Sequence, residues 1–235
     1  MANKKTALIS EAMPLKIREL FGFLGYGCVC LPPFEALDAP VASHPDMLFS
    51  VLSGGELLTD GRYYEKNKAL LDNVGVSIRV SESRLEKSYP EDIAFDALVF
   101  GGRVYGYIKR LAPEILEKSL APVNVKQGYA LCSVLATDKC ALTADEGIYR
   151  ALVSNGADAL KISPEGVNLS GYGRGFIGGA SAFDPISNTV IFLGDVTRHQ
   201  SYPEIKSFLE KRGYKLLYAE NEPLTDYGGA KLLNN

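Results

Sequence analysis

The side chains best suited to catalysis in this chain are its four cysteines and two histidines, which are Cys28, Cys30, Cys132, Cys140, His44 and His199. Four cysteines in 235 residues are too few for a disulfide framework, so we interpret them as reduced thiols. No His, Cys or acidic cluster has the spacing of metal ligands, and we expect no metal site. A thiol here would act as a nucleophile only if its surroundings favoured the thiolate.

The composition predicts a single globular domain over residues 1–235. Hydrophobic residues make up 46% of the sequence, which is enough to bury a substantial core. The formal net charge is −3, and lysine and arginine are spread along the chain, so we expect no nucleic-acid partner. No apolar run is long enough for a signal peptide or a membrane span, which makes the cytoplasm the expected location and a membrane partner unexpected. The sequence leaves the oligomeric state open.

A glycine motif at residues 173–178 matches the G-x-G-x-x-G pattern of dinucleotide-binding loops. That pattern requires a strand that leads into the first glycine and a helix that begins at the last one. Here the run ASAFDP follows the motif, and it is not a helix start. We therefore expect no dinucleotide cofactor, and no other cofactor is indicated.

A short amphipathic helix that ends at a glycine and leads into an apolar run occurs repeatedly in the chain. The four clear copies are IRELFGFLGYGCVCLP, NKALLDNVGVSIRV, IYRALVSNGADALKIS and IKSFLEKRGYKLLY. In the first copy Ile17 and Phe21 lie on one helix face, and Gly25 suits the left-handed conformation at the helix C-terminus. A fifth copy, APEILEKSLAPVNVK, has Pro113 to begin its helix and Pro122 to end it.

Upstream of these helices, pairs of apolar runs flank turn-forming residues, as expected for β-hairpins. The paired runs are 48–52 with 57–60, 97–100 with 104–105, 133–136 with 140–143, and 181–183 with 190–193. Three of the second strands lead into their helix through an aspartate that is placed to cap it, namely Asp60, Asp145 and Asp195.

Each end of the chain contains half of such a unit. Residues 6–10 form a strand with no hairpin partner before it, and residues 230–233 form a strand with no second strand after it. Pairing the two strands would complete a fifth unit and remove two unpaired sheet edges. The sequence therefore predicts five α/β units in a ring that is closed by the N- and C-terminal strands.

Five such units resemble the pentein fold, a five-unit pseudosymmetric α/β propeller. This is the architecture of guanidine-modifying enzymes such as arginine deiminase, agmatine deiminase and dimethylarginine dimethylaminohydrolase, and of a non-catalytic ribosome anti-association factor. The runs QGYALCSVLATDKCALTADEGIYRAL, YGRGFIGGASAFDP and DYGGAKLL look like a bacterial branch of this fold. For that branch the resemblance implies an architecture and no particular activity.

In penteins the starts of the five hairpins surround a central channel that holds the substrate. The resemblance places there a set of carboxylates, polar groups and glycines, namely Asp46, Asp96, Gln127, Tyr129, Gly178, Gly179, Asp226, Gly228 and Gly229. Carboxylates pair bidentately with the planar donors of a guanidinium group. We therefore expect these residues to bind a small cationic, guanidino or amino-acid-like ligand.

The residues that perform deiminase chemistry are missing from their usual places. In deiminase-type penteins a cysteine follows the glycine-rich start of the last half unit, and a histidine lies in mid-chain. Here the two glycines are followed by Ala230 and Lys231, and the run GFIGGASAFD contains no histidine. A rearranged site would use Cys132 as nucleophile and His44 as base, with Asp46 on the same strand face as the orienting group.

Each of these candidates also has a structural interpretation. Cys132 in an apolar strand is typical of a small core residue, and His44 beside a proline is typical of a turn. Lys231 is a ligand contact, an amine nucleophile or a solvated strand residue. Arg174 either binds a carboxylate beside the channel or lies in a surface loop.

Two functional hypotheses follow, and the sequence does not decide whether the protein is an enzyme. The first is a divergent hydrolase or transferase that acts on carbon–nitrogen bonds. The second is a non-catalytic pentein that binds a ligand or a macromolecular partner. The missing cysteine and histidine favour the second hypothesis, whereas the polar, glycine-bearing hairpin starts favour a ligand site.

Overall fold

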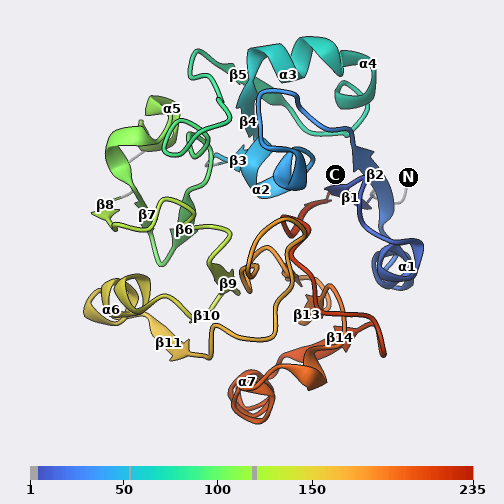
Figure 1. Cartoon of the computed structure of the whole chain (residues 1–235), viewed down its shortest axis with the longest axis vertical. Coiled ribbons are helices and arrows are strands. Elements are labelled where there is room, and N and C mark those ends of the chain that lie inside the picture. Colours follow the sequence, from blue (N-terminus) through green and yellow to red (C-terminus); the bar gives the residue numbers. More distant parts are fainter. Residues whose placement is uncertain (1–4, 53, 118–120, 235) are drawn as a thin grey trace.

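Five three-stranded sheets organise the part of the chain that the structure describes. The computed structural model describes residues 5–52, 54–117 and 121–234. In every sheet the middle strand pairs antiparallel with one neighbour and parallel with the other. The sheets have the orders β15–β1–β2, β3–β4–β5, β6–β7–β8, β9–β10–β11 and β12–β13–β14. They follow one another around the middle of the molecule (Figure 1).

The strands are short and regular in their spacing along the chain. Their bounds are β1 (Lys5–Ser10), β2 (Gly27–Leu31), β3 (Ser50–Val51), β4 (Leu57–Asp60), β5 (Ile78–Ser81), β6 (Leu98–Phe100), β7 (Arg103–Gly106), β8 (Ala121–Asn124), β9 (Val134–Ala136), β10 (Cys140–Thr143), β11 (Asp158–Lys161), β12 (Ser181–Asp184), β13 (Thr189–Phe192), β14 (Lys215–Tyr218) and β15 (Ala230–Asn234). The middle strands β4, β10 and β13 are buried along their whole length. Their nearly continuous apolar sequences are typical of strands covered on both faces.

Most helices connect the middle strand of a sheet to its parallel neighbour. The α-helices are α1 (Leu15–Phe23), α2 (Pro45–Leu48), α3 (Gly61–Lys66), α4 (Lys68–Leu71), α5 (Pro113–Leu116), α6 (Glu146–Ser154) and α7 (Tyr202–Glu210), and the 3₁₀ helices are η1 (Ala39–Val41), η2 (Ile108–Arg110) and η3 (Val196–Arg198). In Figure 1, α1, α6 and α7 lie on the outside of the molecule, and α2 lies closer to its middle. None of the helices in the described residues is long and apolar enough to cross a membrane.

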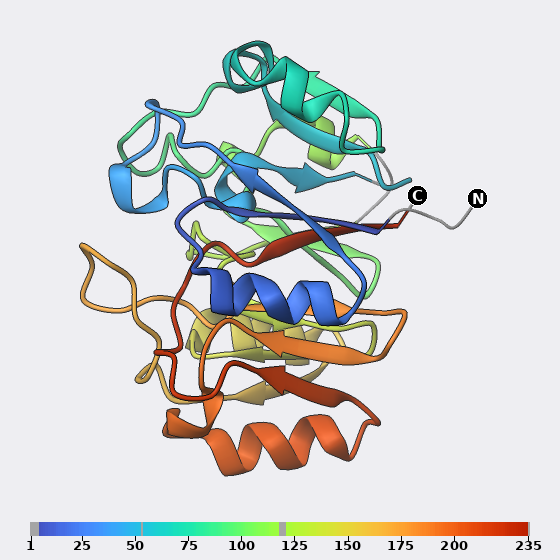
Figure 2. The same cartoon turned by 90° about the vertical axis from the view of Figure 1, so that its right-hand side faces the viewer.

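The predicted pairing of the first and last strands is present. β1 pairs antiparallel with β15, so that Ala7 lies opposite Leu232, and β1 pairs parallel with β2. The two termini accordingly lie at the same end of the molecule (Figure 2). The C-terminal strand is thus an edge strand of the N-terminal sheet.

The predicted helix boundaries are confirmed at both ends. The side chains of Asp60, Asp145 and Asp195 each accept a hydrogen bond from a backbone N–H in the first turn of the following helix. Gly25 and Gly156 follow helices at φ values of +83° and +82°, in the left-handed region where a side chain is unfavourable. Capping aspartates and terminating glycines predict helix ends well because their contacts lie within one helical turn.

The prediction for residues 44–48 is wrong. His44 and Asp46 do not share a strand face, because Pro45 begins the short helix α2 with His44 as its N-cap, and strand β3 is reduced to Ser50–Val51. Proline is favoured at the first helical position, where its fixed φ suits the helix and its missing N–H is not needed.

The prediction for Pro122 is also wrong. Pro122 was expected to end a helix and instead lies in β8, which is an edge strand and tolerates proline.

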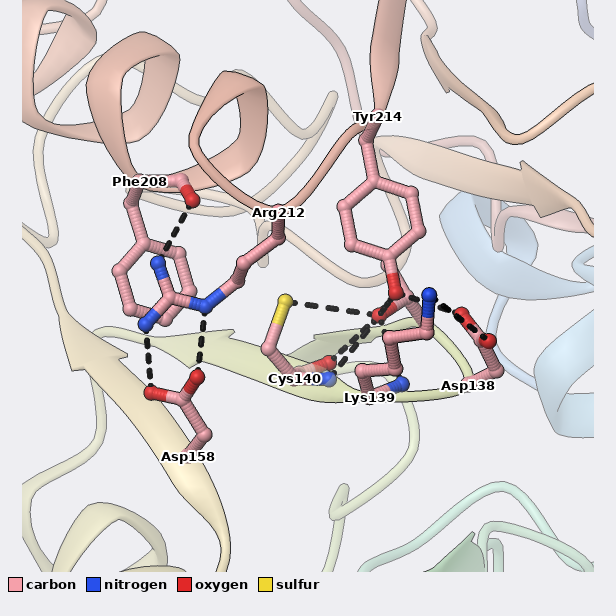
Figure 3. A network of polar contacts seen from close by, with 8 residues as sticks. Asp138, Lys139, Cys140, Asp158, Phe208, Arg212 and Tyr214 are labelled. Atoms are coloured by element: carbon pink, nitrogen blue, oxygen red, sulfur yellow. Dashed lines mark hydrogen bonds and ion pairs between the residues drawn. The ribbon is translucent and has the colours of Figure 1, made fainter.

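Polar contacts join the last two sheets of the chain (Figure 3). The Tyr214 hydroxyl donates to Asp138 Oδ1 at 2.5 Å. Arg212 forms two hydrogen bonds with the Asp158 carboxylate, at 2.6 and 2.7 Å, and its guanidinium lies over the Phe208 ring. A planar guanidinium can stack on a ring and still donate in its own plane, so this arginine holds the end of α7 against β11.

Candidate functional site

Five segments that are distant in sequence meet in the middle of the molecule. They are the start of α2, the residues before β6, the turn before β9, the residues before β12 and the residues that lead into β15. The N–H of Asp46 donates to the carbonyl of Gly228 at 3.2 Å, which joins α2 to the last of these segments. A Cβ at Gly228 would overlap the backbone and side chain of His44, so only a glycine permits this approach.

Cys132 and Asp96 form the first pair of the cluster. The Cys132 thiol donates to Asp96 Oδ2 at 2.7 Å, and the N–H of Leu131 donates to Asp96 Oδ1 at 2.6 Å. Both side chains are buried. Asp96 thus fixes the turn before β9 and the direction of the sulfur at the same time.

His44 and Asp226 form the second pair. His44 Nδ1 lies 3.6 Å from Asp226 Oδ1, and both side chains are buried. The Asp226 carboxylate also accepts hydrogen bonds from the N–H groups of Phe176 at 2.9 Å and Gly228 at 3.0 Å. A Cβ at Gly179 would overlap this carboxylate, so the glycine allows the aspartate into the centre.

Asp46 and Lys231 are the members of the cluster without partners. Asp46 is 3% exposed, and neither carboxylate oxygen has a hydrogen-bond partner among the described residues. Lys231 is also buried, and within the described part of the chain its ammonium makes no ion pair. Both residues line a cavity of about 130 Å³, the central cavity, whose wall includes Gly178, Gly228 and Gly229.

Burial and crowding of like charges set the protonation of the carboxylates. Burial, followed by the charge of Asp46, raises the pKa of Asp96 to about 8 and that of Asp226 to about 7. Both shifts favour a protonated acid near neutral pH. The cluster therefore avoids the full cost of three buried negative charges.

The other three groups are pushed toward their neutral forms as well. Burial raises the pKa of Cys132 well above its usual value, and the carboxylates of Asp46, Asp96 and Asp226 raise it further. Burial lowers the pKa of His44 and that of Lys231, although nearby carboxylates oppose both changes. In this state Cys132 is a thiol that donates a hydrogen bond, and it is not a thiolate nucleophile.

The structure brings most of the predicted site residues together. Those at the centre are His44, Asp46, Asp96, Cys132, Gly178, Gly179, Asp226, Gly228, Gly229 and Lys231. In the part of the chain that the structure describes, no group of three or more His, Cys, Asp or Glu side chains is placed to hold a metal ion.

Several predicted site residues do not line the central cavity. His44, Asp96, Cys132, Gly179 and Asp226 belong to the central cluster but are not part of the cavity wall, and Gln127, Tyr129 and Arg174 lie outside the cluster. The Tyr129 hydroxyl donates to Asp92 Oδ2 at 2.6 Å, and Gln127 and Arg174 line a different cavity. Ser133 and His199 line that second cavity too, and the sequence analysis did not identify them as site residues. The position of Ser133 next to Cys132 could have indicated it, because neighbouring side chains in a tight turn point to different sides.

The arrangement of sheets is that of a pentein. The crystal structure of a histidine-to-glycine variant of dimethylarginine dimethylaminohydrolase, an adduct with S-methyl-L-thiocitrulline, aligns over 100% of both chains with a TM-score of 0.57 and 14% identity. The structure of unliganded AgrE aligns over 98% of this chain with a TM-score of 0.53 and 12% identity, and this chain spans 40% of its length. At such identities the likeness establishes the fold alone.

The family is established by sequence. A family model described as "Family of unknown function (DUF6873)" matches residues 8–230, and the chain belongs to this family. No curated protein matches the chain.

Substitution of Gly179 should disrupt the centre of the molecule. The methyl group of Gly179→Ala would overlap the Asp226 carboxylate, so we expect a loss of about 1–3 kcal/mol in the free energy of unfolding. Gly173→Ala is the matched control, because a Cβ there meets no atom within 4 Å, and its effect should stay within about 0.5 kcal/mol. Urea unfolding measures both values, and equal stabilities of the two variants would contradict the packing described above.

The raised pKa of Asp96 predicts a specific dependence of stability on pH. The unfolded chain loses the Asp96 proton near its ordinary pKa of 3.8, whereas the folded protein keeps it to about 8. The contribution of Asp96 to stability is therefore largest at low pH and decreases as the pH rises toward 8. Asp96→Asn cannot lose this proton, so its stability relative to the wild type should increase by at least about 1 kcal/mol between about pH 5 and pH 8.

Asp195→Asn provides a control of opposite sign. Hydrogen bonding from Thr197 lowers the pKa of Asp195, so the stability that this group contributes is present above its ordinary pKa and is lost as the pH falls. Asp195→Asn should therefore be less stable than the wild type at neutral pH, and thermal unfolding should show that this difference in stability decreases toward low pH. A pH-independent difference between Asp96→Asn and the wild type would contradict the burial effect.

Proposed function

We propose that this protein binds a small cationic ligand of the guanidino or amino-acid-like type in the central cavity. The observation that carries the proposal is the buried carboxylate of Asp46, a residue of the cavity wall, which has no hydrogen-bond partner among the described residues. An unpartnered buried carboxylate is costly, and a ligand that supplies donors and positive charge would remove that cost.

The charges around the cavity support a cation. Asp46, Asp96 and Asp226 all raise the pKa of Cys132, so the three carboxyl groups surround one point, and a bound cation would favour their ionised forms. Lys231 supplies a single positive charge, and its burial favours the neutral amine. A planar guanidinium could donate two parallel hydrogen bonds to Asp46, which a lysine ammonium does not do.

The fold supports the same class of ligand by analogy. The structurally similar hydrolase is named for dimethylarginine, which is a guanidino compound. We further propose that the five sheets form a closed pseudosymmetric propeller, with the central cavity on its axis. The pairing of β1 with β15 and the succession of sheets around the middle of the molecule support this arrangement.

A catalytic role would assign Cys132 as the nucleophile, His44 as the base and Asp46 as the orienting group in hydrolase or transferase chemistry on a carbon–nitrogen bond. A bound cation would lower the pKa of Cys132 by offsetting the surrounding carboxylates, and so would favour the thiolate only when ligand is present. The raised thiol pKa without ligand, and the occurrence of Ala230 and Lys231 after the glycine pair, favour the alternative of a non-catalytic binding protein.

Calorimetric titration with methylguanidine, agmatine and arginine tests the binding proposal. Methylurea is the control ligand, because it resembles methylguanidine in shape and carries no charge. The guanidino compounds should bind, and Asp46→Asn should weaken their binding by at least about tenfold, because it removes a charge-assisted hydrogen-bond acceptor. Asp92→Asn, which changes a buried aspartate outside the central cavity, should leave the affinity unchanged. Equal binding of methylurea, or an unaffected Asp46→Asn variant, would overturn the proposal.

The pH dependence of Cys132 alkylation separates catalysis from binding. If Cys132 is the nucleophile, iodoacetamide should label it at lower pH when methylguanidine is bound, as measured at each cysteine by mass spectrometry. Cys132→Ser should abolish release of ammonia or amine from agmatine without preventing binding. Binding without any ligand-induced change in labelling and without product would leave the non-catalytic function.

A further inference from the structure

A second cavity, of about 160 Å³, lies on the other side of the turn that carries Cys132. Its wall includes Ser133, His199, Gln127 and Arg174, none of which lines the central cavity. Cys132 directs its sulfur at Asp96 in the centre, whereas the next residue, Ser133, is part of the wall of this second cavity. The two cavities therefore share one turn and differ in their lining.

His199, a residue of the cavity wall, carries a buried hydrogen-bond donor. The residue is 3% exposed, and its Nδ1 accepts a hydrogen bond from the N–H of Ser201 at 3.0 Å. Burial lowers the pKa of His199, so the imidazole is neutral and its proton lies on Nε2. Nε2 is buried and has no partner among the described residues.

Ser133 is a second polar group without a partner. Its side chain is 2% exposed, and its hydroxyl oxygen makes no hydrogen bond within the described residues. A buried hydroxyl or imidazole N–H without a partner is destabilising, because it has lost its hydrogen bonds to water. Two such groups on the wall of one cavity indicate that the cavity is built to hold something polar.

The remaining polar groups on the wall are mostly donors as well. The amide oxygen of Gln127 already accepts from the N–H of Tyr129, which leaves its NH₂ group as a donor. The Arg174 side chain is 58% exposed, and its guanidinium reaches Glu165 only at 4.0 Å. Arg174 is thus available to a ligand at the solvent side of the cavity.

The acidic side chains of the wall are already engaged. Asp145 Oδ1 accepts from the N–H of Ile148 at 2.7 Å as the cap of α6. Glu146 pairs with Lys161 and with Arg150, each at 2.7 Å. Among the described residues, the unpartnered buried polar atoms of the wall are therefore His199 Nε2 and the Ser133 hydroxyl oxygen, while Asp145 and Glu146 are the acidic residues of the wall.

We propose that the second cavity binds a small aliphatic carboxylate. The carboxylate oxygens would accept from His199 Nε2 and the Ser133 hydroxyl, with Arg174 providing positive charge from the solvent side. The hydrocarbon part would pack on the apolar portion of the wall, which includes Ile162, Val167 and Ile177. This site is separate from the central cavity and takes a ligand of opposite charge.

The two histidines of the chain make the proposal directly testable. Protein labelled with ¹⁵N only in histidine gives imidazole signals from His44 and His199 alone; His199 lines the second cavity, and His44 lies in the central cluster. Titration with sodium propionate should shift the His199 signals to saturation and leave the His44 signals in place. Sodium chloride and propylammonium chloride at the same concentrations are the controls and should shift neither residue.

Variants distinguish the site from a non-specific effect of salt. Ser133→Ala should weaken propionate binding by about tenfold, because it removes a donor to a charged group. Ser163→Ala is the matched control, since Ser163 lines the same cavity but already donates to Gln200 Oε1 at 2.6 Å. Arg174→Gln changes an exposed side chain, so it should fold normally and also bind propionate more weakly.

Three results would overturn the proposal. The first is an absence of propionate-dependent change in the His199 signals. The second is an equal response to sodium chloride, which would indicate ionic strength alone. The third is a shift of His44 in place of His199, which would put the anion in the central cavity. Loss of methylguanidine binding, in contrast, would affect only the function proposed for the central cavity.

Discussion

The burial of three aspartates around one point is the constraint on which the rest of the centre depends. Asp46, Asp96 and Asp226 cannot all carry a full charge in so small a volume, because each is desolvated and each repels the others. Asp96 and Asp226 respond by holding protons to higher pH and by accepting backbone hydrogen bonds. The Asp46 carboxylate lies close enough to the Cys132 thiol to raise its pKa, but neither of its oxygens has a hydrogen-bond partner in the described part of the chain, and this makes Asp46 the point at which a ligand would act.

The same constraint explains why glycine occupies the central positions. Gly179 lies against the Asp226 carboxylate and Gly228 against His44, at separations that a Cβ would not allow. The N–H groups of Leu131, Phe176 and Gly228 donate to the buried carboxylates and keep them in place, and the missing side chain at Gly179 leaves room for the Asp226 carboxylate. The glycines are therefore part of the electrostatic design of the centre as well as of its turns.

The turn before β9 separates two environments of opposite character. Toward the centre, Cys132 faces carboxylates that need donors or positive charge. Away from it, Ser133 and His199 face a cavity in which the unpartnered atoms need an acceptor. If both proposals hold, one short turn contacts a cationic ligand on one side and an anionic ligand on the other.

The sequence by itself determined the features that depend on neighbouring residues. These features follow from contacts within one helical turn or one strand. They are the helix caps at Asp60, Asp145 and Asp195, the end of a helix at Gly25 and the strand at residues 140–143. The pairing of β1 with β15 was also predictable, because each was an incomplete half of a repeated pattern. Tertiary structure decided the rest. The packing of distant segments placed Asp46 and Lys231 in one cavity wall and raised the pKa of Asp96. It also brought Ser133 and His199 into the wall of a second cavity. Burial and electrostatic interaction depend on distances between such segments, and no local pattern encodes those distances.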